Sequence, residues 1–210
     1  MKQTGTDVNR MVLHGRVAQP PPSPTATMRW SFYLPLAVSR LSGVADQVNV
    51  VASRALLEGC GWLEQGEEVT VHGEVRTFNN RSGVGSRLII SVFAKELLLE
   101  QGEDENRLLL SGTLCKPPSL RSTPLGRTIC DMILAVNRRY GRADYLPCIT
   151  WGSLAHQCGG MEVGSTLYFE GRLQSRTYTK NLGDRTEERV AFEVSVMNLA
   201  AREALEPAAL

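Results

Sequence analysis

The sixteen residues from Tyr145 to Gly160, YLPCITWGSLAHQCGG, combine a strand, a short helix and a stop signal. The first part, 145–151, is rich in β-branched and aromatic residues and is typical of a strand. Ser153 is a preferred N-cap residue, and Gly159-Gly160 ends the predicted helix near Cys158. A single helical turn or two within a strand-rich region is the feature that distinguishes one small β fold from another.

Short segments with a period of two surround this stretch, and they predict five strands with the helix between the third and the fourth. The predicted strands are 108–114, 129–139, 145–151, 166–179 and 189–199. Periodicity alone also fits a generic small barrel. The position of the helix favours the OB-fold, a five-stranded Greek-key barrel. We therefore expect a mainly all-β protein.

The same pattern occurs earlier in the chain, at an offset of 98 residues. Three pairs of matching segments or residues share this offset: Leu36–Arg40 with Leu134–Arg138, Asp46 with Asp144, and Gly73 with Gly171. Residues 90–94 match 194–198 at an offset of 104, so the second copy has about six extra residues between its last two strands. Insertions of this kind belong in hairpin loops. Two tandem OB-folds are predicted.

The repeat predicts the domain boundaries. The first copy places its helical segment at Ala52–Cys60, and a polar, acidic linker joins the two copies. The predicted ranges are 1–10 for an N-terminal tail, 11–100 for the first OB domain, 101–106 for the linker, 107–200 for the second OB domain and 201–210 for a C-terminal tail.

Composition excludes several classes of protein. With 42% hydrophobic residues the 210-residue chain can bury two small cores, but no apolar run is long enough for a membrane span or a signal peptide. We expect a cytoplasmic protein without a membrane partner. The five cysteines are odd in number with no CxxC pair, and the three histidines are scattered. Reduced, mostly buried thiols, no metal site and no cofactor are therefore expected.

Charge is divided unevenly along the chain. Residues 1–106 hold 10 Lys and Arg against 12 Asp and Glu, whereas residues 107–202 hold 13 against 8. The last eight residues add two glutamates and no base. A basic second half in a nearly neutral protein predicts a polyanionic partner for that half.

Residue parity selects one face of the second copy, because side chains alternate across a strand. In the fourth strand Leu167, Phe169 and Leu173 share the core parity. The opposite parity gives a row of donors and cations that includes an aromatic ring: Arg172, Gln174, Arg176, Tyr178 and Lys180. Tyr145 and Trp151 share a parity in the third strand, and Arg138-Arg139-Tyr140 follow the second.

Aromatic rings interleaved with cations on one face are suited to binding single strands, because the rings can stack on bases and the cations can contact phosphates. Cross-strand packing of a tyrosine, and core packing of Trp151 beside Ile149, remain alternatives.

The most specific pieces of residues 122–199 are LAVNRRY, YLPCITWGSLA and YFEGRLQSRTY, with LSGTLCKPPSLR ahead of them. In these pieces the chain resembles the bacterial single-stranded DNA-binding protein family. The resemblance implies base stacking on Tyr140, Tyr145, Trp151 and Tyr178, with Arg138, Arg172 and Arg176 along the strands. Arg139, Lys180 and Arg121 complete the predicted nucleic-acid-binding set.

The first copy lacks this set of rings. At the offset of 98, the four aromatic positions become Ser42, Gln47, Ser53 and Asn80, and Arg172 becomes Glu74. A weaker DNA path through Arg76, Phe78, Arg81 and Arg87 is one interpretation of this domain. Scaffolding or subunit pairing is the other. Trp30, Phe32 and Tyr33 are expected in a core or an interface, and Pro20–Pro24 is interpreted as a stiff connector.

The leading hypothesis is a non-catalytic, sequence-independent single-stranded DNA-binding protein that acts in replication, recombination or repair at the bacterial nucleoid. Because the family works with four OB-folds, a homodimer is expected. The alternative is a partner-dependent OB accessory factor, for replication restart or for a mobile element, whose first domain serves oligomerisation or protein interaction. The absence of the family's acidic C-terminal tip leaves protein partners open. A nuclease using Asp184, Glu187 and Glu188 and an RNA-binding protein are further alternatives.

Overall fold

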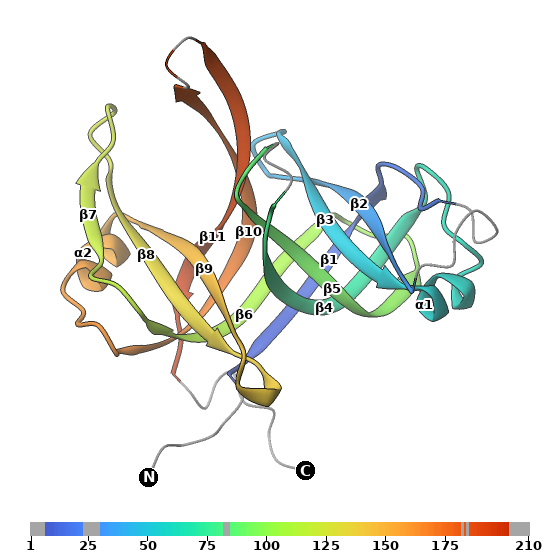
Figure 1. Ribbon diagram of the computed structural model, residues 1–210, viewed down its shortest axis with the longest axis horizontal. Helices are drawn as coiled ribbons and strands as arrows, with labels where there is room; N and C mark the ends of the chain where they lie inside the picture. Colours follow the sequence, from blue (N-terminus) through green and yellow to red (C-terminus); the bar gives the residue numbers. More distant parts are fainter. Residues whose placement is uncertain (1–6, 23–29, 82–84, 182, 184, 202–210) are drawn as a thin grey trace. The chain divides into compact units, whose positions relative to one another are not determined.

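The computed structural model describes residues 7–22, 30–81, 85–181, 183 and 185–201. These residues are mainly in strands, with two short α-helices and one short 3-10 helix (η2) (Figure 1). Across this described part of the chain, no helix has the length and apolar character needed to cross a bilayer. Residues 23 and 24 of the predicted proline connector lie outside the described residues.

The N-terminal barrel is formed by β1 (Asn9–Val17), β2 (Ser31–Ser39), β3 (Ala45–Ser53), β4 (Glu68–Asn79) and β5 (Leu88–Leu99), with α1 (Arg54–Gly59) between β3 and β4. Strand β1 pairs with both β2 and β4, β2 pairs with β3, and β5 pairs antiparallel with β4 and parallel with β3. These pairings close the barrel, and the inward parity of each strand supplies its core, for example Leu13, Leu34, Val50, Val71 and Val92.

The C-terminal barrel repeats this topology with β6 (Glu105–Leu114), β8 (Thr128–Asn137), β9 (Ala143–Trp151), β10 (Thr166–Asn181) and β11 (Thr186–Leu199). Helix α2 (Ser153–Gly159) again lies between the third and fourth strands, and β9 pairs parallel with β11. Its core includes Leu110, Leu134, Leu146, Phe169 and Val194. Two tandem OB-folds, each with a helix between its third and fourth strands, are confirmed.

Matching residues occupy matching positions in the two barrels. A Cβ atom added at Gly73 would lie 2.3 Å from the carbonyl oxygen of Phe93, and one added at Gly171 would lie 2.6 Å from that of Ser195. Both glycines are therefore required where β4 meets β5 and where β10 meets β11. Tyr145 faces Ala135 across the β8–β9 ladder just as Gln47 faces Ala37 across β2–β3. The offset of 98 residues is thus a structural equivalence.

Local expectations were wrong at several points. Gly152, not Ser153, is the N-cap of α2, and it has φ 59°. In the first copy the N-cap of α1 is Ser53, whose Oγ accepts from the amide of Leu56 at 3.3 Å. Residues 138–139 leave the strand, because Arg139 starts the short 3-10 helix η2 (Arg139–Gly141). Strand β7 (Ser119–Ser122) was not predicted, because its four exposed residues show no alternation.

Contacts divide the chain into two compact units that do not follow the predicted ranges everywhere. Among the described residues, the first unit comprises those of 10–107 and 174–192, and the second comprises those of 7–9, 108–173 and 193–201. The outer half of the β10–β11 hairpin, which the repeat assigned to the second OB domain, therefore belongs with the N-terminal barrel. Strand β6 begins at Glu105, inside the predicted linker. The linker carboxylate of Asp104 accepts from the amide of Ser39 at 2.7 Å.

Candidate nucleic-acid interface

Two rings lie on the outer face of the β8–β9 ladder. Tyr145 is 55% exposed and Trp151 is 39% exposed. They lie on the same face of β9, six residues apart, with Pro147 and Ile149 between them. Because a strand rises about 3.3 Å per residue, their Cα atoms are roughly 20 Å apart. Trp151 is therefore not enclosed in the core, although the neighbouring Ile149 is buried.

A third ring stands on the turn between these strands. Tyr140 is 97% exposed and has a left-handed backbone with φ 66°. The turn is closed by a hydrogen bond of 2.7 Å from the amide of Arg138 to the carbonyl oxygen of Arg142. Arg139, next to the ring, is also exposed. Strands β8 and β9 and the turn that joins them thus carry all three exposed rings, Tyr140, Tyr145 and Trp151.

Arg138 has a structural contact that the sequence analysis did not predict. Its guanidinium forms an ion pair with Asp144, whose side chain is fully buried. Arg40 and Asp46 form the equivalent pair at the β2–β3 turn, where Asp46 is 1% exposed. The shared offset of 98 was the available signal, since both members of the pair repeat together. Arg138 therefore holds the turn that presents Tyr140.

The remaining predicted residues of β10 fall in both units. Arg172 belongs to the second unit, and its Nε is buried without a hydrogen-bond partner among the described residues. Arg176, Tyr178 and Lys180 belong to the first unit. The guanidinium carbon of Arg176 lies 5.6 Å from the centroid of the Tyr178 ring, a cation–π arrangement. Gln174, predicted in the exposed row, is buried.

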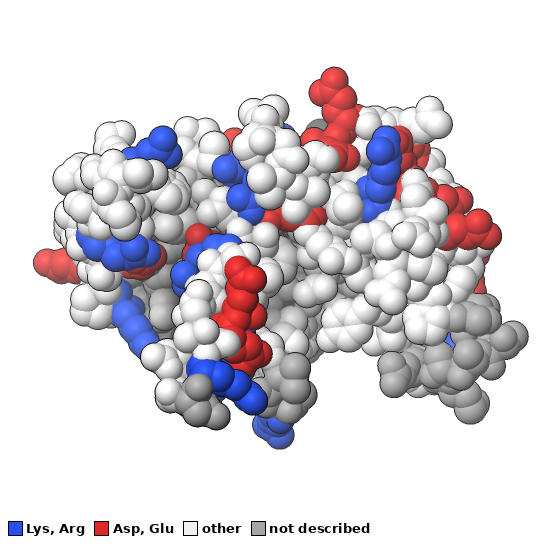
Figure 2. Space-filling view, turned by 90° about the horizontal axis from the view of Figure 1, so that it is seen from above, with Lys and Arg blue, Asp and Glu red and all other residues white. Residues whose placement is uncertain are grey.

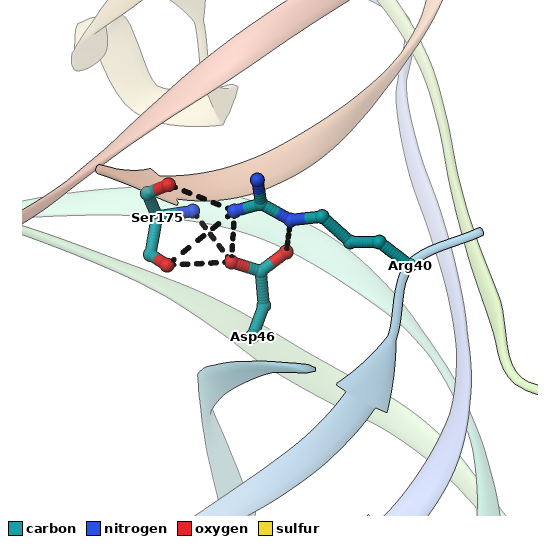
Figure 3. A network of polar contacts seen from close by, with 3 residues as sticks. All are labelled: Arg40, Asp46 and Ser175. Carbon is teal, nitrogen blue, oxygen red and sulfur yellow. Dashed lines mark hydrogen bonds and ion pairs between the residues drawn. The ribbon is translucent and has the colours of Figure 1, made fainter. Parts of the chain in front are cut away.

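Ser175 attaches the outer hairpin to the N-terminal barrel (Figure 3). Its amide and its hydroxyl both donate to Asp46 Oδ1, at 2.8 and 2.6 Å, while Arg40 Nη2 donates to its carbonyl oxygen at 2.8 Å. Burial raises the pKa of Asp46, but the hydrogen bonds from Arg40 and Ser175 outweigh it, so the pKa lies below its ordinary value. Asp46 is thus a charged, hydrogen-bonded anchor within the first unit.

Arg121 lies on β7 and pairs with Asp131 on β8, with half of its side chain exposed. In the N-terminal barrel, Arg76 pairs with Glu74, which also pairs with Lys95. Phe78 is 38% exposed and its ring centroid lies 5.7 Å from that of Phe93. The other two residues predicted for a weaker path, Arg81 and Arg87, are exposed beside the β4–β5 hairpin.

A groove of about 520 Å³ crosses the outer face of the N-terminal barrel. Residues of β3, of the β4–β5 hairpin and of the outer β10–β11 hairpin line it, and none of them is charged. They are Ala45, Gln47, Asn49, Asn80, Ser86, Leu88, Ile89, Ile90, Ser175, Val190, Ala191 and Phe192. Gln47 and Asn80 are the equivalents of Tyr145 and Tyr178, so the groove includes two of the four positions at which the first copy lacks a ring.

Positive charge is dispersed. On the face drawn in Figure 2, blue Lys and Arg side chains stand apart among white uncharged residues, with acidic groups between some of them. The five cysteines are free thiols, three of them buried, and burial raises the pKa of Cys148, one of these three. Among the described residues, no three His, Cys, Asp or Glu side chains gather as a metal site requires.

Known proteins resemble this chain in sequence and in fold. A model of the single-strand binding protein family matches residues 105–200. Single-stranded DNA-binding protein A of Bacillus subtilis is 38% identical over 87 residues, which are 38% of this chain and 51% of that protein. The single-stranded DNA-binding protein of Clostridium tetani is 36% identical over 101 residues, which cover 44% of this chain and 70% of the relative. The chain thus spans between half and about two thirds of these relatives.

A solved structure covers both barrels. The wild-type single-stranded DNA-binding protein from Thermus aquaticus superimposes with a TM-score of 0.74 over 98% of each chain, at 24% identity. This similarity concerns the fold, whereas the sequence matches concern the C-terminal half. With two OB-folds and a C-terminal half that matches these bacterial relatives, the chain belongs to the single-strand binding protein family.

Proposed function

We propose that the protein binds single-stranded DNA without sequence preference and without catalysis, by stacking bases on Tyr140, Tyr145 and Trp151. The observation that carries this proposal is the exposure of three rings on one pair of strands and the turn that joins them. Each base has a π-face, so such rings accept any sequence. Arg139 and Arg121 are exposed cations on the same barrel that suit the phosphates, and Arg172 lies on its β10 strand. Membership of the family and the bacterial relatives support the same ligand.

The function we infer is protection of single strands in replication, recombination or repair, by a homodimer that provides four OB-folds. Arg176, Tyr178 and Lys180, which belong to the first unit, are further proposed contacts with DNA. Sedimentation equilibrium at micromolar concentration should give twice the chain mass. A monomer that binds DNA with full affinity would contradict the dimer and leave the stacking proposal intact.

Tryptophan fluorescence tests the proposal directly. Oligo-dT should quench the wild-type protein, and Trp151→Phe should remove most of the quench, because an excited indole stacked on a base is quenched while a phenyl ring is silent. The other two tryptophans provide the comparison: Trp30 is 86% exposed, whereas Trp62 packs edge-on against Phe32 with ring centroids 5.1 Å apart. No binding of oligo-dT by the pure protein would overturn the proposal and favour the partner-dependent accessory factor.

Salt should weaken the complex steeply. If about five phosphates are neutralised, the slope of log affinity against log salt is expected near −3.5, from roughly −0.7 per phosphate on single strands. Titrations with oligo-dT between low and high NaCl give this slope. The charge-removing variant Arg139→Gln should reduce its magnitude by about 0.7 if that residue contacts a phosphate. A slope near zero would exclude phosphate contacts as a source of affinity.

A further inference from the structure

The N-terminal barrel carries an exposed ring outside the positions that the repeat marks. Tyr33 lies on β2 directly opposite Val51 of β3. It is 56% exposed, which matches the 55% of Tyr145. Its neighbours in sequence, Phe32 and Leu34, point into the core. Tyr33 therefore stands on the outer face of β2–β3, which is the equivalent of the β8–β9 face.

The register of the β2–β3 ladder places the ring of Tyr33 close to the positions at which the first copy has no aromatic residue. On the outer face Gln47, Asn49, Val51 and Ser53 follow one another along β3, and Gln47 and Ser53 are the equivalents of Tyr145 and Trp151. Tyr33 faces Val51, so it lies one strand across, roughly 4.8 Å, from the line that joins those two positions. The residue at its position in the second copy is Asp131, which faces Ile149. A ring is thus present on this face, but on the neighbouring strand.

The surroundings of Tyr33 suit a nucleic acid strand. Asn49 is diagonal to it across the ladder and lines the uncharged groove together with Gln47 and Asn80. Amide groups can donate to and accept from base edges. Arg87 is exposed between Ser86 and Leu88, two residues that line the same groove. The groove thus offers amides to bases and a cation at its rim to a phosphate.

The acidic residue that occupies the position of Arg172 in this domain already forms ion pairs. Glu74 replaces the arginine of the second copy, and its charge would repel phosphates. Both Arg76 and Lys95 form ion pairs with it. The two cations therefore largely offset this repulsion.

We propose that the N-terminal barrel has its own single-stranded DNA site, in which Tyr33 of β2 stacks on a base and Gln47, Asn49 and Asn80 contact base edges in the adjoining groove. In the C-terminal barrel two of the proposed stacking rings lie on the third strand, β9, whereas Tyr33 lies on the second strand of its barrel, β2. This inference rests on the proposed function and adds a second site to it, with residues that the family's pattern does not mark.

Photo-cross-linking tests the site in the full-length protein. A dT oligonucleotide carrying 5-iodouracil should cross-link on irradiation to the tryptic peptide 30–40, with fragment ions placing the adduct on Tyr33. A second adduct on peptides of the C-terminal barrel reports the site already proposed. Adducts on the C-terminal barrel alone would overturn this inference and leave the proposed function standing. Absence of any adduct together with absence of binding would overturn both.

Affinity gives an independent readout. Tyr33→Ala should weaken binding of an oligonucleotide long enough to span both barrels about 5- to 150-fold, the range expected for loss of one stacked base, whereas Tyr33→Phe should retain it. The matched control is Leu99→Ala, which removes an apolar side chain of similar exposure, 51%, outside the groove. Equal affinities for Tyr33→Ala and Leu99→Ala would contradict the stacking role.

Trp30 supplies a local signal. It lies three residues from Tyr33, and in the Trp151→Phe protein it is the exposed tryptophan of the described residues. Oligo-dT should still quench part of the fluorescence of this variant, and Trp30→Phe in addition should remove that part. A complete loss of quenching in Trp151→Phe alone would place the DNA away from this face.

Discussion

The double variant Tyr145→Ala/Trp151→Ala is expected to lose about 2 to 6 kcal/mol of binding free energy for oligo-dT, since each base–aromatic stack contributes roughly 1 to 3 kcal/mol. Both rings are exposed on β9 and neither fills the core, so the folded barrel should persist. The measurement is equilibrium titration by fluorescence anisotropy of a labelled oligonucleotide, with circular dichroism to verify the fold.

Val163→Ala is the matched control for this variant. Val163 is 53% exposed in the loop between α2 and β10 and is not part of the β8–β9 ladder. Its affinity should equal that of the wild type. A folded double variant with wild-type affinity would contradict stacking on β9, and phosphate contacts would then have to account for binding.

Asp46→Ala is expected to destabilise the first unit by about 3 to 5 kcal/mol, the usual cost of removing one partner from a buried ion pair. The substitution leaves Arg40 partly buried without its carboxylate, and the amide and hydroxyl of Ser175 lose their acceptor. Guanidinium unfolding followed by circular dichroism measures the loss. Hydrogen exchange should also rise in the outer half of β10, because Ser175 anchors it.

Glu68→Gln provides the contrast. Glu68 pairs with Arg16 at 2.7 Å, but Arg16 is 67% exposed, so solvent screens the pair and its loss should cost much less stability than the loss of Asp46. If Asp46→Ala and Glu68→Gln had equal effects, the buried anchor would have no special role.

Acidic pH provides a second test of the contribution of Asp46 to stability. The pKa of Asp46 is lowered in the folded state, so its contribution is present above the unfolded value, about 4, and is lost as pH falls below it. The wild type should therefore lose more stability in acid than Asp46→Ala.

Repetition made much of the fold predictable. The offset of 98 identified the two barrels, the order of strands, the helix position and the paired glycines Gly73 and Gly171, because those features depend on local patterns that duplication copies. It also marked Asp46 and Asp144 together with Arg40 and Arg138, although not the ion pairs that these residues form. The extra residues of the second copy lie in the β10–β11 hairpin, whose strands have 16 and 14 residues against 12 in each of β4 and β5.

Features formed by distant or irregular residues could not be predicted. Ser175 binds Asp46 across 129 residues of chain, and serine in a strand has no pattern that announces such a contact. Strand β7 is exposed throughout and lacks alternation. Tyr33 was assigned with Trp30 and Phe32 to a core or interface, but adjacent strand residues face opposite sides, so Phe32 alone is buried. Strict use of parity would have separated the two rings.

The shared hairpin has a consequence for how the two halves can evolve and be engineered. Residues 174–192 complete the N-terminal unit although they are encoded almost at the end of the chain. A gene cut within 101–106 would yield an N-terminal fragment that keeps Arg40 but lacks Ser175, the other hydrogen-bond partner of Asp46, and that lacks one wall of the groove. The first half of the chain is therefore not a self-contained unit, and a fragment designed to preserve it has to include residues 174–192.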